Sequence, residues 1–212
     1  MKKLISSRAR NLLYYSLTLL MGLVLSSSSC NPQDAPDPDG VKINGVVWAK
    51  YNVESPGYFA PNPGSPGMFY QWNRKVGWPA TGVVIGWNTT YPPAAWNPDN
   101  DPCPDGWRVP TQLELERLCD GTKVLFTKQT QNGNDGMLFT DIASNNSIFL
   151  PAAGERDETN GNLSFVNQVG YYWSNTAMPD NGAIMLDVSM STTVYIAQVH
   201  TRYGLSIRCV KK

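Results

Sequence analysis

A single stretch of the chain carries a complete helix signal, and this constrains the fold more than any other feature of the sequence. Thr111 and Glu114 are spaced as a capping box, and Gly121 is a natural helix stop. Between them an apolar stripe runs at helical spacing, formed by Leu115, Leu118 and Cys119. The sequence therefore predicts one helix that begins after Thr111 and ends before Gly121.

Most of the remaining chain carries strand signals separated by Asn, Asp and Gly clusters. Val41–Tyr51 is typical of two short strands with Gly45 in the turn between them. After the helix, strands are predicted at Ile148–Ala152, Tyr171–Trp173, Ala183–Val188, Thr192–Val199 and Leu205–Val210. Trp78–Asp105 differs, because aromatic residues lie among prolines and asparagines, as in a long ordered loop. The pattern predicts an α+β fold with an antiparallel sheet, one clear helix and long irregular loops.

The N-terminus has the pattern of an export signal. Met1–Arg10 is basic, Leu12–Leu25 is apolar, and Ser26–Ser29 is a small-residue cleavage zone. Cys30 follows directly, and this architecture resembles the lipobox of bacterial lipoproteins, although Ser27 stands where that box usually carries leucine. We expect residues 1–29 to be a lipoprotein signal peptide and Cys30 to be lipidated. The alternative is a simple secretory peptide cleaved near Ser29, which would leave Cys30 an ordinary thiol.

The segment that follows Cys30 is composed of residues that cannot pack. Residues 30–41 are rich in proline and aspartate, which is typical of an extended tether. We expect this tether to hold a domain of residues 42–212 off a membrane to which the lipid anchors it. The predicted location is the outer membrane, with the domain facing the cell surface.

The charge balance argues against a nucleic-acid partner. Four of the 17 basic residues precede Cys30, so thirteen basic residues face 17 acidic residues after it, a net charge of −4. The sequence contains no Lys/Arg cluster that could follow a phosphate backbone. Charged residues are only 16% of the chain, and 18 glycines, 16 prolines and seven tryptophans indicate many loops held by aromatic rings.

Several segments, taken in order along the chain, resemble one known family. The longest, residues 101–116, contains Gly-Trp-Arg-Val-Pro-Thr leading into the predicted helix. The other segments are GMFYQWNRK (67–75), FLPAAGER (149–156), GYYWSN (170–175) and GLSIRCV (204–210). Together they resemble the Fibrobacter succinogenes major paralogous domain, found widely in Bacteroidetes surface lipoproteins. The resemblance covers roughly Ile43–Lys211 and implies a fold similar to C-type lectin-like domains and to formylglycine-generating enzymes.

The resemblance also implies a disulfide. The cysteine of the DPCP segment and that of the IRCV segment recur together in the family pattern, which pairs Cys103 with Cys209. An exported protein lies in an oxidising setting that permits such a bond. Cys119 lies on the apolar stripe and is better interpreted as a small core residue. A bridge between Cys103 and Cys119 stays open as the alternative.

Catalytic residues are not predicted. His200 is the one histidine, so neither a His-based zinc site nor a dyad with a second histidine can be built. Formylglycine-generating enzymes need a reactive cysteine pair near the C-terminus, where this chain has only Cys209. The resemblance to those enzymes therefore implies fold alone.

No metal or other cofactor is predicted, and calcium is the one alternative that the composition suggests. Trp173-Ser174-Asn175 matches part of the calcium-dependent lectin pattern, but the Glu-Pro-Asn or Gln-Pro-Asp loop is missing. Oxygen-rich clusters occur at residues 97–101, 132–135 and 155–158. Calcium prefers such ligands, yet solvated turns have the same composition, and we favour turns.

A binding surface rich in aromatic rings is the remaining expectation. Trp107 and Trp173 are predicted to be core rings, whereas Trp78, Trp87 and Trp96 are predicted to be exposed ligand-binding rings. We expect a non-catalytic recognition domain that binds a glycan, or an envelope or fimbrial protein, in adhesion. The alternative is a structural or fimbria-associated envelope subunit without a soluble ligand.

Overall fold

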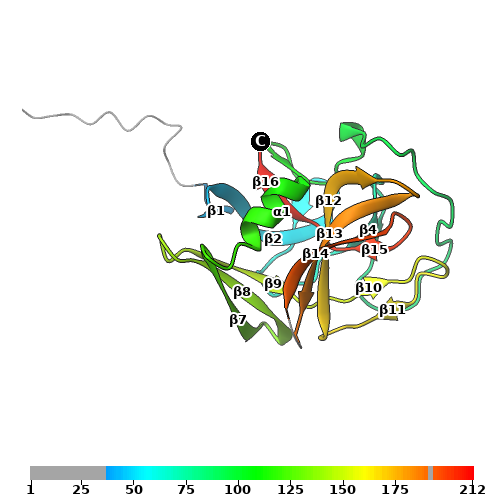
Figure 1. The fold of residues 1–212 in the computed structure, drawn as a ribbon. Helices are drawn as coiled ribbons and strands as arrows, with labels where there is room; N and C mark the ends of the chain where they lie inside the picture. Colours follow the sequence, from blue (N-terminus) through cyan, green and yellow to red (C-terminus); the bar gives the residue numbers. More distant parts are fainter. Residues whose placement is uncertain (1–36, 191–192) are drawn as a thin grey trace, which may run out of the picture. The chain divides into compact units, whose positions relative to one another are not determined.

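The computed structural model describes residues 37–190 and 193–212 (Figure 1). The predicted signal peptide, the lipidation at Cys30 and most of the predicted tether lie outside the described residues. No helix among the described residues has the length and apolar character needed to cross a membrane.

The described residues form small antiparallel sheets, and the first of them joins the two ends of the domain. Its strands are β1 (Gly40–Ile43), β2 (Val46–Ser55), β3 (Tyr58–Phe59), β6 (Trp107–Arg108) and β16 (Arg208–Lys211). The order is β1-β2-β16-β6, with β3 paired to β2. Trp48 on β2 lies opposite Val210 on β16, so strands from the beginning and the end of the domain are neighbours in this sheet.

The second sheet carries the loops that form the candidate site. Its strands are β4 (Phe69–Gln71), β5 (Gly77–Trp78), β10 (Glu155–Arg156), β11 (Leu163–Ser164) and β15 (Gly204–Leu205). They are arranged in the order β11-β10-β15-β4-β5. A long loop (residues 79–106) leaves β5 and returns at β6; its regular structure is one turn of 3-10 helix, Pro98–Asn100.

Two three-stranded sheets complete the fold. One contains β12 (Val169–Met178), β13 (Gly182–Ser189) and β14 (Val194–His200), and the other contains β7 (Val124–Gln131), β8 (Asn134–Asp141) and β9 (Ser147–Pro151). Every paired strand in the described part of the chain is antiparallel. With one α-helix within residues 37–190 and 193–212, the fold is α+β and mostly β.

The helix α1 (Gln112–Leu118) begins where its capping box predicts. Thr111 Oγ1 accepts the Glu114 N–H at 3.3 Å, and Glu114 Oε2 accepts the Thr111 N–H at 2.8 Å. Cys119 is the C-cap in a right-handed conformation, and Gly121 has no positive φ. The helix thus ends before Gly121, as predicted, but it ends at Cys119 without the left-handed glycine that the stop signal implies. The buried Leu115 and Leu118 face the core, and α1 contacts β12, β13 and β14.

The core has two clusters that differ in composition. Aliphatic residues of β1, β9, β13 and α1 dominate the first, whereas the second contains three tryptophans. Trp72, Trp107 and Trp173 lie in the second cluster and are almost fully buried. The prediction that Trp107 and Trp173 are core rings is confirmed.

Two strand predictions need correction. Leu205–Val210 is not one strand but two, β15 and β16, because the chain changes sheets between them. Between the two strands, the backbone carbonyl of Ser206 accepts the backbone N–H of Trp173. The backbone N–H of Ser206 donates to Tyr171 O, so this segment is hydrogen-bonded to β12. The hairpin of β7 and β8, residues 124–141, was not predicted at all.

A disulfide ties the long loop to the last strand. Cys103 and Cys209 are bonded across a sequence separation of 106, with their Cα atoms 6.1 Å apart. This confirms the pairing implied by the family resemblance and excludes the Cys103–Cys119 alternative. Cys119 is a free thiol packed against the first core cluster, and burial raises its pKa to about 12.

Candidate functional site

A cleft of about 500 Å³ opens where the end of β4 and β5 meet the long loop. One side is formed by Gln71, Asn73, Arg74, Lys75, Val76 and Trp78. The other side is formed by Gly86, Asn88, Pro92, Pro93 and Asn100. The cleft is thus built from one strand pair and the irregular loop that follows it in the sequence, which lies on the far side of the domain from β7 and β8 in Figure 1.

The beginning of the long loop is fixed by a buried arginine. Arg156 on β10 is fully buried, and its guanidinium donates to Pro79 O at 2.8 Å and to Thr81 O at 3.1 Å. It also donates to Gly161 O at 2.6 Å. A buried cation that is satisfied by backbone carbonyls holds irregular chain in one conformation, because each lost contact would leave a buried polar group unpaired.

Three consecutive carbonyls in the middle of the loop each accept a hydrogen bond from a different side chain. Gln71 Nε2 donates to Asn88 O at 2.7 Å, and Arg202 Nη1 donates to Thr89 O at 3.2 Å. Arg74 Nη2 donates to Thr90 O at 2.9 Å. The loop wall of the cleft is therefore held by groups from β4, from the turn after it and from the turn after β14.

Asn73 fixes the last part of the loop. Its backbone is left-handed, with φ of 55°. Its Nδ2 donates to Ala95 O at 2.9 Å, and its Oδ1 accepts the Asn97 N–H at 2.9 Å. Asn100 Nδ2 donates back to Asn73 O at 2.9 Å. The cleft is consequently pre-formed, which reduces the ordering cost of binding.

The three predicted ligand-binding tryptophans occupy different positions, and none of them is exposed. Trp78 and Trp87 lie together with ring centroids 5.0 Å apart, but only Trp78 lines the cleft. Trp87 donates Nε1–H to Glu158 O at 3.1 Å, and a Cβ on Gly161 would lie 2.7 Å from its ring. Trp96 packs against the core ring of Trp72 at 5.4 Å.

All three rings are half-buried, so the expectation of exposed rings is wrong. The reason is that the long loop lacks regular structure, and the rings of Trp87 and Trp96 supply its packing against the domain. A ligand-binding role for Trp78, Trp87 or Trp96 stays a prediction, and the cleft makes Trp78 the ring best placed for it.

A cluster of charged and aromatic groups beside the loop was not anticipated from the sequence. Glu158 Oε2 lies 2.8 Å from Arg202 Nη2 and 3.1 Å from His200 Nδ1. The Arg202 guanidinium carbon lies 4.2 Å from the centroid of the Tyr91 ring. These four residues join the long loop to the end of β14. His200 therefore lies beside an Arg–Glu ion pair at the end of its strand.

The oxygen-rich clusters form turns. Asp101 accepts the N–H groups of Cys103 and Val109 at 2.9 and 3.0 Å, and Asp157 accepts the Thr159 N–H at 2.8 Å. Residues 132–135 contain the turn of the β7–β8 hairpin. Within residues 37–190 and 193–212, no three His, Cys, Asp or Glu side chains are grouped so as to hold a metal ion.

The Trp-Ser-Asn segment of β12 is occupied by internal contacts. Trp173 Nε1 donates to Tyr70 O at 2.7 Å, and Ser174 Oγ donates to Ile184 O at 2.8 Å. Asn175 Nδ2 points to Val109 O at 3.5 Å. These side chains hold β12 against the strands and loops around it, and the residues that line the cleft lie elsewhere.

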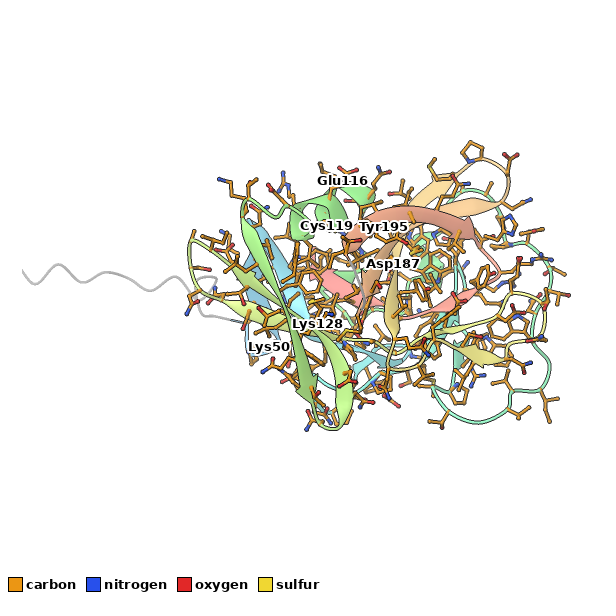
Figure 2. All side chains as sticks on the ribbon, turned by 60° about the horizontal axis from the view of Figure 1, so that its bottom comes forward. Lys50, Glu116, Cys119, Lys128, Asp187 and Tyr195 are labelled. Atoms are coloured by element: carbon orange, nitrogen blue, oxygen red, sulfur yellow. A yellow bond between two sulfur atoms is a disulfide. The ribbon has the colours of Figure 1, made fainter. Side chains whose placement is uncertain are left out.

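Glu155, which lies outside the cleft, should make the stability of the fold depend on pH. Burial, with the nearby charges of Asp157 and Asp187, raises the pKa of Glu155 to about 7. Asp187 on β13 is itself buried and accepts a hydrogen bond from Tyr195 on β14 at 2.9 Å (Figure 2). The folded protein therefore binds more protons than the unfolded chain between about pH 4.5 and 7, and its stability falls as pH rises through that window.

Glu155→Gln should remove this dependence. At pH 8 the variant is expected to be more stable than the wild type by about 1 kcal/mol, a value reduced for the partial exposure of the side chain. At pH 4.5 the two should be equal. Urea unfolding at both pH values measures the difference, with Glu116→Gln on the exposed side of α1 as the control (Figure 2). Equal stabilities at pH 8 would contradict the raised pKa.

Fold and site together define a class of protein. It is a mostly antiparallel α+β domain with one disulfide, in which a long irregular loop is fixed by side-chain hydrogen bonds beside a cleft. The family model of the Fibrobacter succinogenes major domain matches residues 41–211, and the chain belongs to this family. No curated protein and no solved structure gives a match to the chain.

Proposed function

We propose that the chain is a non-catalytic recognition protein of the cell surface whose C-type lectin-like domain binds a glycan in the cleft beside Trp78. The lipid on Cys30 would anchor it to the outer membrane, and its role would be adhesion. The observation that carries the proposal is the composition of the cleft. A half-buried indole ring stands among amide side chains on a backbone that is fixed before any ligand arrives.

The chemistry of such a cleft suits a sugar. Sugar rings present apolar C–H faces that stack on an aromatic ring, and their hydroxyl groups both donate and accept hydrogen bonds. Gln71, Asn73, Asn88 and Asn100 supply amide groups around Trp78. The proposal includes no cofactor, because the described residues hold no group of three His, Cys, Asp or Glu side chains that could bind a metal ion.

A glycan array probed with the purified protein tests this function. We expect saturable binding that is the same with calcium and with a chelator. Trp78→Ala should weaken it at least tenfold, because the ring face on which the sugar would stack is lost. Tyr58→Ala is the matched control, since Tyr58 is an exposed aromatic residue that does not line the cleft. A blank array with correctly folded protein would overturn the proposal.

One observation favours a second candidate, a structural or fimbria-associated envelope subunit. The tip of the long loop exposes Val83 by 88% and Ile85 by 93%, next to the cleft residue Gly86. Exposed aliphatic residues on a fixed loop are typical of a protein contact. A blank array, combined with co-purification of an envelope protein that Val83→Asp abolishes, would favour this candidate over a glycan receptor.

A further inference from the structure

The lining of the cleft carries positive charge and, among the described residues, no carboxylate. Arg74 and Lys75 both line it, and none of the described residues that line it is acidic. Outside the lining, the charge of Lys75 interacts with that of Asp101, whereas no carboxylate of the described residues acts on the pKa of Arg74. None of the ion pairs among the described residues includes Arg74 or Lys75. This local charge contrasts with the negative balance of the chain after Cys30.

The surroundings of Arg74 show that its partners are neutral. Its Nη2 donates to the carbonyl and hydroxyl oxygens of Thr90, at 2.9 and 3.1 Å. Its Nε is buried and has no hydrogen-bond partner. Partial burial lowers the pKa of the guanidinium, and no carboxylate offsets the cost. An anion in the cleft would supply the missing charge and a charge-assisted hydrogen bond.

A second unpartnered group belongs to Gln71, which lines the same cleft. Gln71 is only 1% exposed, and both of its amide hydrogens are used, toward Asn88 O and Arg202 O at 2.7 Å. Its Oε1 is buried without a hydrogen-bond donor. The two bonds of Nε2 fix the orientation of the amide, so Oε1 is left as an acceptor that a hydroxyl group of a ligand could satisfy.

We infer that the cleft selects an acidic sugar, with the carboxylate of a uronic-acid residue at Arg74 and Lys75, a ring hydroxyl at Gln71 Oε1 and the sugar face on Trp78. This inference rests on the proposed glycan-binding function and specifies its ligand class. Each feature of the cleft then has one part of the ligand to recognise. A neutral sugar would leave the partly buried Arg74 without a counter-charge.

A matched pair of ligands separates the effect of the carboxylate charge on binding from the effect of the sugar rings. Trigalacturonic acid and its fully methyl-esterified form share the same sugar rings and differ in their carboxylates. Calorimetric titration of the purified protein should show the acid binding at least tenfold more tightly than the ester at 50 mM NaCl. The preference should shrink at 500 mM NaCl, because salt screens partly exposed charges.

Variants of the two cations locate the effect. Arg74→Gln should remove most of the preference for the acid, and Lys75→Gln should reduce it a few-fold, whereas Arg74→Lys should retain part of it. Lys128→Gln is the control, since Lys128 is an exposed cation on β7, away from the cleft (Figure 2). If Arg74→Gln weakens acid and ester equally, the residue acts only by holding Thr90, and the inference is wrong.

The remaining outcomes distinguish the inference from the function on which it rests. If the ester or neutral glycans bind as well as the acid, the inference fails while glycan binding stands. If neither probe binds and the glycan array is blank, both fail. A preference for the acid that Lys75→Gln and Arg74→Gln leave intact would place the anion elsewhere and overturn the assignment to this cleft.

Discussion

Replacing Cys103 and Cys209 together by alanine is expected to lower the free energy of unfolding by about 3–4 kcal/mol. The disulfide closes a loop with a sequence separation of 106, and the chain-entropy model gives about 4.7 kcal/mol as the upper value for a loop of that size. The bond also joins the long loop to β16, where Cys209 is fully buried in the tryptophan-rich cluster. The loss should therefore combine a freer unfolded chain with weaker packing at the end of the loop.

Urea unfolding followed by tryptophan fluorescence measures this loss, and Cys119→Ala is the matched control. Cys119 is a free thiol that packs at the edge of the aliphatic cluster, so its removal should cost about 1 kcal/mol or less. Similar losses for the double variant and the control would mean that the bridge adds nothing beyond the packing of its sulfur atoms. A loss of binding in the double variant is also expected, because the far end of the cleft wall is no longer held.

Local signals predicted those parts of the fold that depend on neighbouring residues. The capping box placed the start of α1, and Gly45 marked the turn between β1 and β2, where Asn44 and Gly45 both have positive φ. The pairing of Cys103 with Cys209 came from the family resemblance, because spacing alone allows more than one partner. The end of α1 was less predictable, since Cys119 closes it without a left-handed glycine.

The missed hairpin shows what a pattern of apolar residues cannot detect. In β7 only Val124 is buried, and the other side chains are exposed or half-buried. Because the strand has no buried face, its sequence shows no alternation of apolar and polar residues. Asn132 and Gly133, with φ of 51° and 81°, form the two-residue turn that an Asn-Gly pair favours. That pair was the available signal, and it was interpreted only as part of an oxygen-rich cluster.

The sequence predicted the aromatic residue of the cleft but not its polar residues. Clustered aromatic residues drew attention to Trp78, but the composition did not show that Trp87 and Trp96 serve mainly to pack the loop. Gln71 and Arg74 belong to the segment GMFYQWNRK, which indicated only the family. Their role depends on partners that the sequence does not place nearby, such as Arg202, which is 131 residues from Gln71.

The role of Arg208 in the core also depends on partners that are distant in the sequence. Its removal should have the largest effect of any single substitution considered. The side chain is 1% exposed, with no carboxylate among its hydrogen-bond partners. It donates to Asn52 Oδ1 and Phe149 O, both at 2.9 Å, and to Ala49 O at 3.2 Å. Burial lowers its pKa to about 10, still well above neutral, so the guanidinium stays charged and joins β16 to β2 and β9.

Arg208→Ala is expected to cost about 4 kcal/mol or more, because three buried oxygens lose their donors and a cavity is left. Arg208→Met fills most of the volume and should recover only the cavity part, which separates the two causes if the alanine variant does not fold. Urea unfolding at neutral pH measures both, and Arg117→Ala on the exposed side of α1 should change little. If Arg208→Met is as stable as the wild type, the hydrogen bonds contribute no net stability and Arg208 acts in the core mainly through its volume.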